Sequence, residues 1–149
     1  MIRQSRAARM LLGAAALSAA FLSPAMAFEA KLRYDPVDGG GLWSVAQFGS
    51  LTEPVQIDTG ASRTAITDSI ALQLLENGEA EVMREGKNVM ADGSEHTSFE
   101  LRIFNVQFGN RAFHNIHAIT VPDSGTCLWG LPQLGAHFTI DLHKNTLTF

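Results

Sequence analysis

Val55-Gln56-Ile57 leads straight into Asp58-Thr59-Gly60-Ala61-Ser62-Arg63, and this stretch decides the fold. An apolar strand delivers the carboxylate of Asp58 into a turn of small residues, so we expect it to be buried and yet to face a cleft. Thr59 supplies a hydroxyl, Gly60 supplies a permissive backbone, and no bulky side chain blocks access. The alternative is structural, because an Asp beside a Gly also makes Asx turns and helix caps.

The segments around this stretch predict a β-rich domain with one clear helix. The expected strands, bounded by turn residues, cover 42–48, 52–57, 64–67, 99–103, 106–108, 111–121, 138–142 and 146–149. Asp68 is expected to cap a helix over 69–76, which Asn77-Gly78 then ends. The charged segment 79–87 is expected to face solvent, and Ala91-Asp92-Gly93-Ser94 is expected to make a turn between strand-like residues.

Taken in order, these elements resemble a retropepsin-type aspartic peptidase of the exported, single-domain bacterial kind. The resemblance rests on the loop from Asp58 to Ser62, a flap-like hairpin with its tip at Ala91 to Ser94, and the apolar-apolar-Gly element Leu128-Trp129-Gly130. It implies a mainly β fold, namely a closed β-barrel of the retropepsin (acid protease) type with one short helix. It also implies a single lobe that dimerises, because the sequence holds one such loop.

The activity that the resemblance implies is that of an aspartic endopeptidase, which hydrolyses a polypeptide substrate as a homodimer and without a cofactor. Two Asp58 carboxylates about 3 Å apart cannot both ionise comfortably, so they share one proton. The ionised carboxylate takes a proton from a water between them, and that water attacks the scissile carbonyl. The protonated carboxylate donates to the carbonyl oxygen, so we expect the best activity on the acidic side of neutrality.

The resemblance also assigns roles to the neighbours of Asp58. Thr59 should hydrogen-bond to the loop of the partner subunit and lock both acids in place. Gly60 should allow the tight turn and present a backbone group near the substrate. Ala61 would form a wall of the subsite beside the acid, and Ser62 would hydrogen-bond to the outer carboxylate oxygen.

More distant segments are expected to complete the site. Asp92 and Gly93, at the hairpin tip, would close over an extended peptide that adds as a strand. Gly130 would let the second apolar strand pass close under the loop. Trp129 would either wall the substrate or simply fill the core, as Trp commonly does. The chain departs from the family after Gly130, where Leu131-Pro132-Gln133-Leu134 replaces the usual residues, so we expect the turn that supports the dimer to be altered.

Residues 1–27 predict a cleaved export signal, which leaves 28–149 as one domain. Three arginines precede an apolar stretch from Met10 to Leu22, and Ala25-Met26-Ala27 fits the small-x-small cleavage rule. An uncleaved anchor is less favoured, because this stretch is well short of the roughly 20 apolar residues that span a bilayer. We therefore expect a periplasmic protein, with the membrane relevant only as the location of a possible substrate.

The composition of the predicted mature chain argues against nucleic acid as a partner. The signal removes three of the 11 basic residues and none of the 15 acidic ones, so 8 against 15 leaves a formal charge of −7. Cys127 is the only cysteine in the sequence, so it makes no internal disulfide. Its apolar surroundings predict a buried, unreactive thiol.

The histidines do not predict a metal site. His114 and His117 lie three residues apart on one expected strand, so their side chains point to opposite faces and do not chelate together.

The competing interpretation of the whole chain is a catalytically silent relative of the same fold. Such a protein would bind peptides or a partner protein in the same cleft, or would act as a monomeric adaptor. The intact Asp-Thr-Gly triplet favours the enzyme, because a binding module does not need that acid.

Overall fold

The computed structural model describes residues 27–35, 41–89 and 93–149, and these form a mainly β fold with two short helices. The elements are β1 (Glu29–Lys31), β2 (Arg33–Asp35), β3 (Gly41–Phe48), β4 (Leu51–Asp58), β5 (Thr64–Thr67), α1 (Asp68–Glu76), β6 (Ala80–Val89), β7 (Glu95–Phe108), β8 (Arg111–Val121), β9 (Leu128–Gly130), α2 (Leu131–Leu134), β10 (Thr139–Asp141) and β11 (Thr146–Thr148). Every strand expected from the sequence is present. Apart from Ala27, the predicted signal sequence lies outside the described residues.

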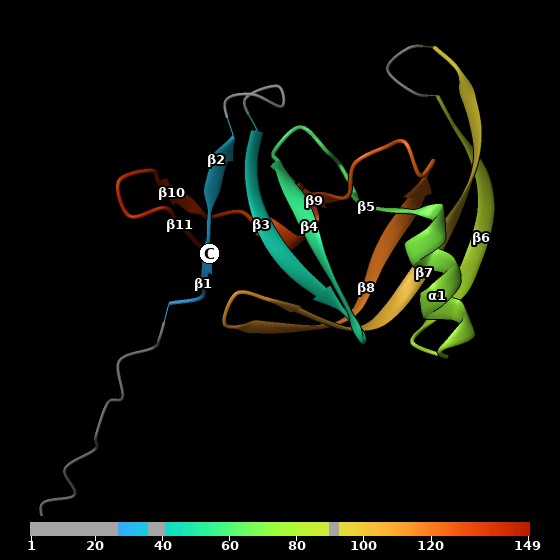
Figure 1. The fold of residues 1–149 in the computed structure, drawn as a ribbon, viewed down its shortest axis with the longest axis horizontal. Helices are drawn as coiled ribbons and strands as arrows, with labels where there is room; N and C mark the ends of the chain where they lie inside the picture. Colours follow the sequence, from blue (N-terminus) through green and yellow to red (C-terminus); the bar gives the residue numbers. More distant parts are fainter. Residues whose placement is uncertain (1–26, 36–40, 90–92) are drawn as a thin grey trace, which may run out of the picture.

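Six of the strands close into a barrel. The larger sheet runs in the order β2-β3-β4-β9-β5-β8-β7-β6, and β3 also pairs with β7, with Ala46 opposite Phe108 (Figure 1). That extra pairing joins β3, β4, β9, β5, β8 and β7 into a ring, with β2 and β6 outside it. The predicted closed β-barrel with a short helix is confirmed.

A parallel pairing fixes the end of β4, and a second one lies nearby in the same sheet. β4 pairs in parallel with β9, which places Asp58 opposite Gly130, and β5 pairs in parallel with β8. Val55 and Ile57 point to the same face of β4 and are both buried, whereas Pro54, earlier in the same strand, is exposed. The apolar lead-in therefore does what the sequence predicts: its buried residues pack into the core, and the strand carries Asp58 to the edge of the barrel.

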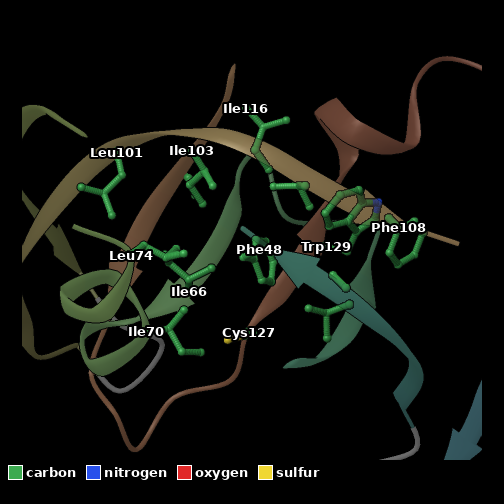
Figure 2. Close-up of a cluster of buried hydrophobic side chains, with 14 of the residues drawn as sticks. Phe48, Ile66, Ile70, Leu74, Leu101, Ile103, Phe108, Ile116, Cys127 and Trp129 are labelled. Carbon is green, nitrogen blue, oxygen red and sulfur yellow. The ribbon is translucent and has the colours of Figure 1, made fainter. Parts of the chain in front are cut away.

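Trp129 lies in the middle of the hydrophobic core (Figure 2). It stacks on Phe108 with ring centroids 4.2 Å apart and meets Phe113 edge-on at 5.3 Å. Such aromatic pairs add about 0.5–1.5 kcal/mol beyond the burial of the rings. Cys127 belongs to the same cluster and is buried as predicted, and burial raises the pKa of its thiol.

The helix α1 is present where expected but is capped differently. Thr67, not Asp68, is its N-cap residue, and Asp68 lies in the first turn, where its charge suits the helix dipole. Oδ1 of Asp123, on the loop after β8, accepts the N–H of Ser69 at 2.9 Å. The helix ends at Asn77-Gly78, as predicted. Neither helix in the described part of the chain is long and apolar enough to cross a membrane.

The charged segment 79–87 faces solvent as expected, but most of it is strand. β6 pairs antiparallel with β7 and places Arg84 opposite Glu100. Most β6 side chains are exposed, so the alternation of apolar and polar residues that indicates a strand is weak here. β6 and β7 form the hairpin predicted as a flap, and its tip residues Ala91 and Asp92 lie outside the described residues.

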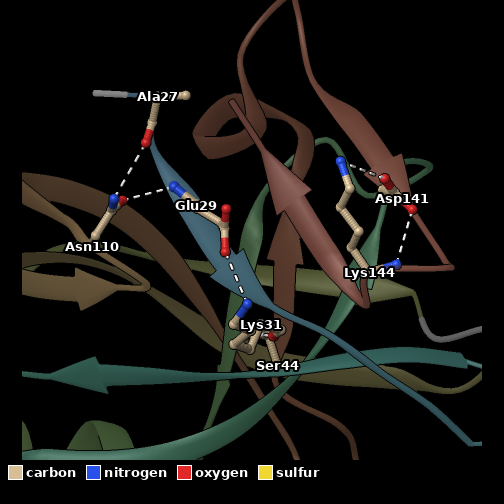
Figure 3. A network of polar contacts seen from close by, with 7 residues as sticks. All are labelled: Ala27, Glu29, Lys31, Ser44, Asn110, Asp141 and Lys144. Atoms are coloured by element: carbon tan, nitrogen blue, oxygen red, sulfur yellow. Dashed lines mark hydrogen bonds and ion pairs between the residues drawn. The ribbon is translucent and has the colours of Figure 1, made fainter. Parts of the chain in front are cut away.

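The segment around the predicted cleavage site is tied to the barrel (Figure 3). Nδ2 of Asn110 donates to the Ala27 carbonyl at 3.3 Å, and Oδ1 of Asn110 accepts the N–H of Glu29 at 2.7 Å. The hydroxyl of Ser44 donates to the Lys31 carbonyl at 2.6 Å. β1 also pairs with β11, so the two ends of the described chain share one small sheet.

Candidate active site

Asp58 is the last residue of β4 and is half-buried in the single chain. Its Oδ1 accepts the N–H of Gly60 at 2.8 Å, and a Cβ on Gly60 would lie 3.2 Å from that oxygen. This is the hydrogen bond of an Asx turn, so the structural alternative for Asp58 is present in the fold. Oδ2 of Asp58 has no hydrogen-bond partner among the described residues, so it can accept a hydrogen bond from a water or a substrate.

The loop after Asp58 is held by β9 and α2. The N–H of Leu131 donates to the Ala61 carbonyl at 2.9 Å. The fully buried Thr64 accepts the N–H of Gly130 at 3.3 Å and donates to Oε1 of Gln133 at 2.5 Å. The residues that depart from the family pattern therefore form a helical turn whose Gln133 side chain is tied to the far end of the loop.

A cavity of about 640 Å³ lies beside the loop. One wall is formed by Gly60, Ala61 and Ser62, and another is formed by residues 84–87 of β6. Figure 1 shows the loop after β4 and the β6–β7 hairpin rising on the same side of the barrel. Ala61 and Ser62, both predicted to bind substrate, thus border a space large enough for part of a peptide.

Thr59 and Ser62, on the loop, and Gly93, on the hairpin, lie in different environments. Thr59 and Ser62 are exposed, and within the described chain no hydrogen bond reaches either hydroxyl. The expected bond from Ser62 to the outer oxygen of Asp58 is therefore not formed in the single chain. Gly93 turns the hairpin with a φ of +83° and is not part of the cavity wall, while Asp92 lies outside the described residues.

Trp129 belongs to the core and not to the cleft. Its side chain is 0% exposed, and it is not part of the cavity wall. Phe108, Phe48 and Phe113 surround the ring. Direct contact with a substrate is therefore not available to Trp129, and of its two expected roles the core role is the one that the packing supports.

The cavity wall also contains a charged cluster that the sequence pattern does not reveal. Oε2 of Glu100 accepts from Nη1 of Arg63 at 3.2 Å and from Nε of Arg84 at 2.5 Å. Oε1 of Glu100 lies 3.1 Å from Nδ1 of His117. The hydrogen bonds with His117 and Arg84 hold the pKa of Glu100 below its usual value. Arg63 is in the decisive stretch itself, but Glu100 and Arg84 meet only through the pairing of β6 with β7, which the sequence did not reveal.

The structure offers no metal centre in the part of the chain that it describes. No group of three or more His, Cys, Asp or Glu side chains there could hold a metal ion. His114 and His117 are both on β8, and they contact different residues, Asn105 and Glu100.

Comparison with solved structures identifies the class of fold. The crystal structure of a retropepsin-like aspartic protease from Rickettsia conorii matches with a TM-score of 0.59 and 23% sequence identity, covering 81% of this chain and 98% of that chain. No protein-family model and no curated protein sequence matches. The chain therefore has a retropepsin-like fold, and the resemblance predicted from the Asp58 loop is confirmed at the level of structure.

Proposed function

We propose that this protein is an aspartic endopeptidase that works as a homodimer, with Asp58 from each of two copies in one shared site. The observation that carries the proposal is the state of the Asp58 carboxylate. One oxygen is fixed by the N–H of Gly60 and the other is free, and the loop that follows borders a cavity of about 640 Å³. The similarity to a retropepsin-like aspartic protease supports this assignment.

The need for a second copy follows from the chemistry. The sequence contains one Asp-Thr-Gly loop, and one carboxylate cannot supply both the base and the acid that the mechanism uses. The exposed hydroxyl of Thr59 has no partner among the described residues, so it is available to the loop of a second copy. Two Asp58 carboxylates brought together in this way share one proton, and that proton belongs to the pair.

Each group in the loop then has a task. The N–H of Gly60 keeps Oδ1 in place, so that Oδ2 holds the attacking water or the proton destined for the scissile carbonyl. The water attacks the carbonyl carbon, the ionised Asp58 accepts a proton from it, and the protonated Asp58 donates to the carbonyl oxygen. One Asp58 then protonates the leaving amine as the peptide bond breaks, and a hydroxyl of the tetrahedral intermediate gives its proton to the other Asp58, which restores the shared proton.

The test is cleavage of a peptide library by wild-type protein and the Asp58→Asn variant across about pH 4 to 7. Glu53→Gln is the matched control, because it removes a carboxylate from the same strand without touching the loop. We expect cleavage by the wild type and by Glu53→Gln, and none by Asp58→Asn. Cleavage by Asp58→Asn would show that the reaction does not need the Asp58 carboxylate, and it would contradict the proposal.

The silent-binder interpretation makes the opposite forecast from the same experiment. A verified wild-type dimer that cleaves nothing at any pH, yet binds peptides as well as Asp58→Asn does, would be a peptide-binding protein with this fold.

We further propose that the protein acts in the periplasm on another periplasmic or membrane protein, after removal of residues 1–27. The proposal rests on the signal-like sequence, and the hydrogen bond between Glu29, two residues after the expected cleavage point, and Asn110 supports it. Mass spectrometry of the protein from a periplasmic extract should give a chain that starts at Phe28. Recovery of the intact chain in the membrane fraction would favour the anchor instead.

A further inference from the structure

The cleft wall contains two guanidinium groups that share a single carboxylate. Arg63 comes from the loop after β4 and Arg84 from β6, and both contact the same oxygen of Glu100 on β7. The Glu100 side chain is 17% exposed, whereas those of Arg63 and Arg84 are 47% and 62% exposed. Each arginine also uses one nitrogen for this contact, and a guanidinium has five N–H donors. Donors therefore remain available on both side chains.

The local charge is positive even though the whole chain is acidic. Two guanidinium groups face one carboxylate, and His117 adds a further contact to the other oxygen of Glu100, against a formal charge of −4 for the sequence. Nearby Glu81 does not compensate for that excess. Arg102, two positions along β7, is already paired with Glu81.

The charged residues next to Arg84 on β6 do not cancel the excess either. Arg84 is opposite Glu100 in the register, and Glu85 is opposite Phe99, so the side chain of Glu85 points to the other face of the hairpin. Lys87 is on that other face as well, and it pairs with Glu95 at 3.0 Å. Glu85 and Lys87 both line the cavity, and the described lining still holds three cations, Arg63, Arg84 and Lys87, against two carboxylates, Glu85 and Glu100.

The cluster of Arg63, Arg84 and Glu100 lies in the same cavity as the loop after Asp58. Arg63, Arg84 and Glu100 line the cavity together with Ala61 and Ser62. Arg63 is five residues from Asp58, and guanidinium groups recognise carboxylates with directional, paired hydrogen bonds. A polypeptide held across the loop would bring side chains near the scissile bond against this wall.

We propose that Arg63 and Arg84 form a specificity subsite that takes an acidic side chain, Asp or Glu, of the polypeptide substrate within a few residues of the cut. The inference rests on the proposed function, since it names the substrate class of the same site. Glu100 holds the two guanidinium groups side by side in the absence of substrate, and the substrate carboxylate uses the donors that Glu100 leaves free.

The experiment uses pairs of peptides that differ only by Glu or Gln at one position, scanned along the length of the peptide. For the wild-type protein we expect kcat/KM to be at least about fivefold higher for the Glu peptide at one position. Arg63→Gln and Arg84→Gln should each bring that ratio toward 1, whatever happens to the absolute rates. Arg33→Gln is the control, because it removes an exposed arginine of β2 that is likewise paired with a carboxylate. It should leave the ratio unchanged.

A purely structural role for the cluster makes different forecasts. If the ion pairs only tie the hairpin to the loop, Arg63→Gln will lower kcat/KM for both members of each peptide pair by the same factor. A wild-type ratio near 1 at every position, or a ratio that survives both substitutions, would overturn the subsite.

A binding measurement separates this inference from the proposed function. Fluorescence anisotropy of the same peptide pairs with Asp58→Asn protein reports on the subsite without turnover. Tighter binding of the Glu peptide, lost when Arg63→Gln is added to Asp58→Asn, would uphold the subsite even if the wild type cleaved nothing. Cleavage by the wild type without any preference for Glu would uphold the peptidase and discard the subsite.

Discussion

The backbone of Gly130 passes so close under Arg63 that no side chain fits between them. A Cβ built on Gly130 would lie 2.4 Å from the Arg63 carbonyl oxygen, 2.6 Å from its carbon and 3.0 Å from the Thr64 nitrogen. All three atoms belong to the backbone, which cannot rotate away as the end of a side chain can. The close passage of the second apolar strand under the Asp58 loop, expected from the resemblance, is thus a property of the structure.

Gly130→Ala should destabilise the protein by about 3 kcal/mol, because the new methyl group must push apart β9 and the end of the loop. Urea denaturation measures the change. Gly86→Ala is the control, since a Cβ at Gly86 would meet nothing within 4 Å, and its effect should stay within about 0.5 kcal/mol. Equal effects of the two substitutions would mean that the close approach at Gly130 does not exist in solution.

Thr64→Val should cost about 2 kcal/mol, because it removes a buried hydroxyl that serves two partners. Without this hydroxyl, the N–H of Gly130 and the side chain of Gln133 lose their hydrogen bonds inside the protein. Thr64→Ser keeps the hydroxyl and should cost clearly less in the same denaturation experiment. If serine proved as damaging as valine, packing and not hydrogen bonding would explain the role of Thr64.

Asp123→Ala should lower the urea midpoint near neutral pH, because the N–H of Ser69 in the first turn of α1 loses its acceptor. Asp123→Asn keeps a side-chain oxygen and should lower the midpoint less. The hydrogen bonds from Ser69 hold the pKa of Asp123 below its usual value of 3.8. The carboxylate therefore stabilises the fold above that value, and the stabilisation is lost as the pH falls through the lower pKa of the folded state.

The pH dependence provides the check on this interpretation. The difference in midpoint between wild type and Asp123→Ala should be unchanged from neutral pH down to about pH 5 and should shrink only below 3.8. A difference that already closes between about pH 7 and pH 6 would assign the effect to a histidine instead of Asp123.

The parts of the fold that the sequence predicts are those in which local pattern and tertiary environment agree. β8 has the bounds expected for it, and β4 delivers Asp58 as expected, because each has apolar residues that meet the core. The sequence predicts β6 only as a solvated segment, because both of its faces are largely exposed and its residues therefore show no clear alternation. Its pairing with β7, which the sequence does not reveal, makes it a strand. The segments of β1 and β2 are three residues each, too short to carry a period.

The same distinction between local pattern and tertiary contact holds within the candidate site. Asp58, Gly60 and Ala61 are adjacent in the sequence, so their grouping needs no knowledge of the fold. Asp123, which accepts the N–H of Ser69 in α1, is 54 positions from it in the sequence. Arg84 and Glu100, which are in contact, are 16 positions apart. Such contacts depend on strand register, which a single sequence without a strong alternating pattern does not fix.

Mixing wild-type and Asp58→Asn subunits should reveal whether one site needs two copies. If subunits combine at random in equal amounts, about a quarter of the dimers contain two wild-type copies, and half of the wild-type subunits lie in mixed dimers. Because a mixed dimer lacks one of the two carboxylates, activity per wild-type subunit should fall to about half after the subunits have been allowed to exchange. Mixing with Glu53→Gln, whose loop is intact, should cause no loss. Activity that stayed constant on mixing with Asp58→Asn would place the whole catalytic apparatus within a single chain and contradict the shared site.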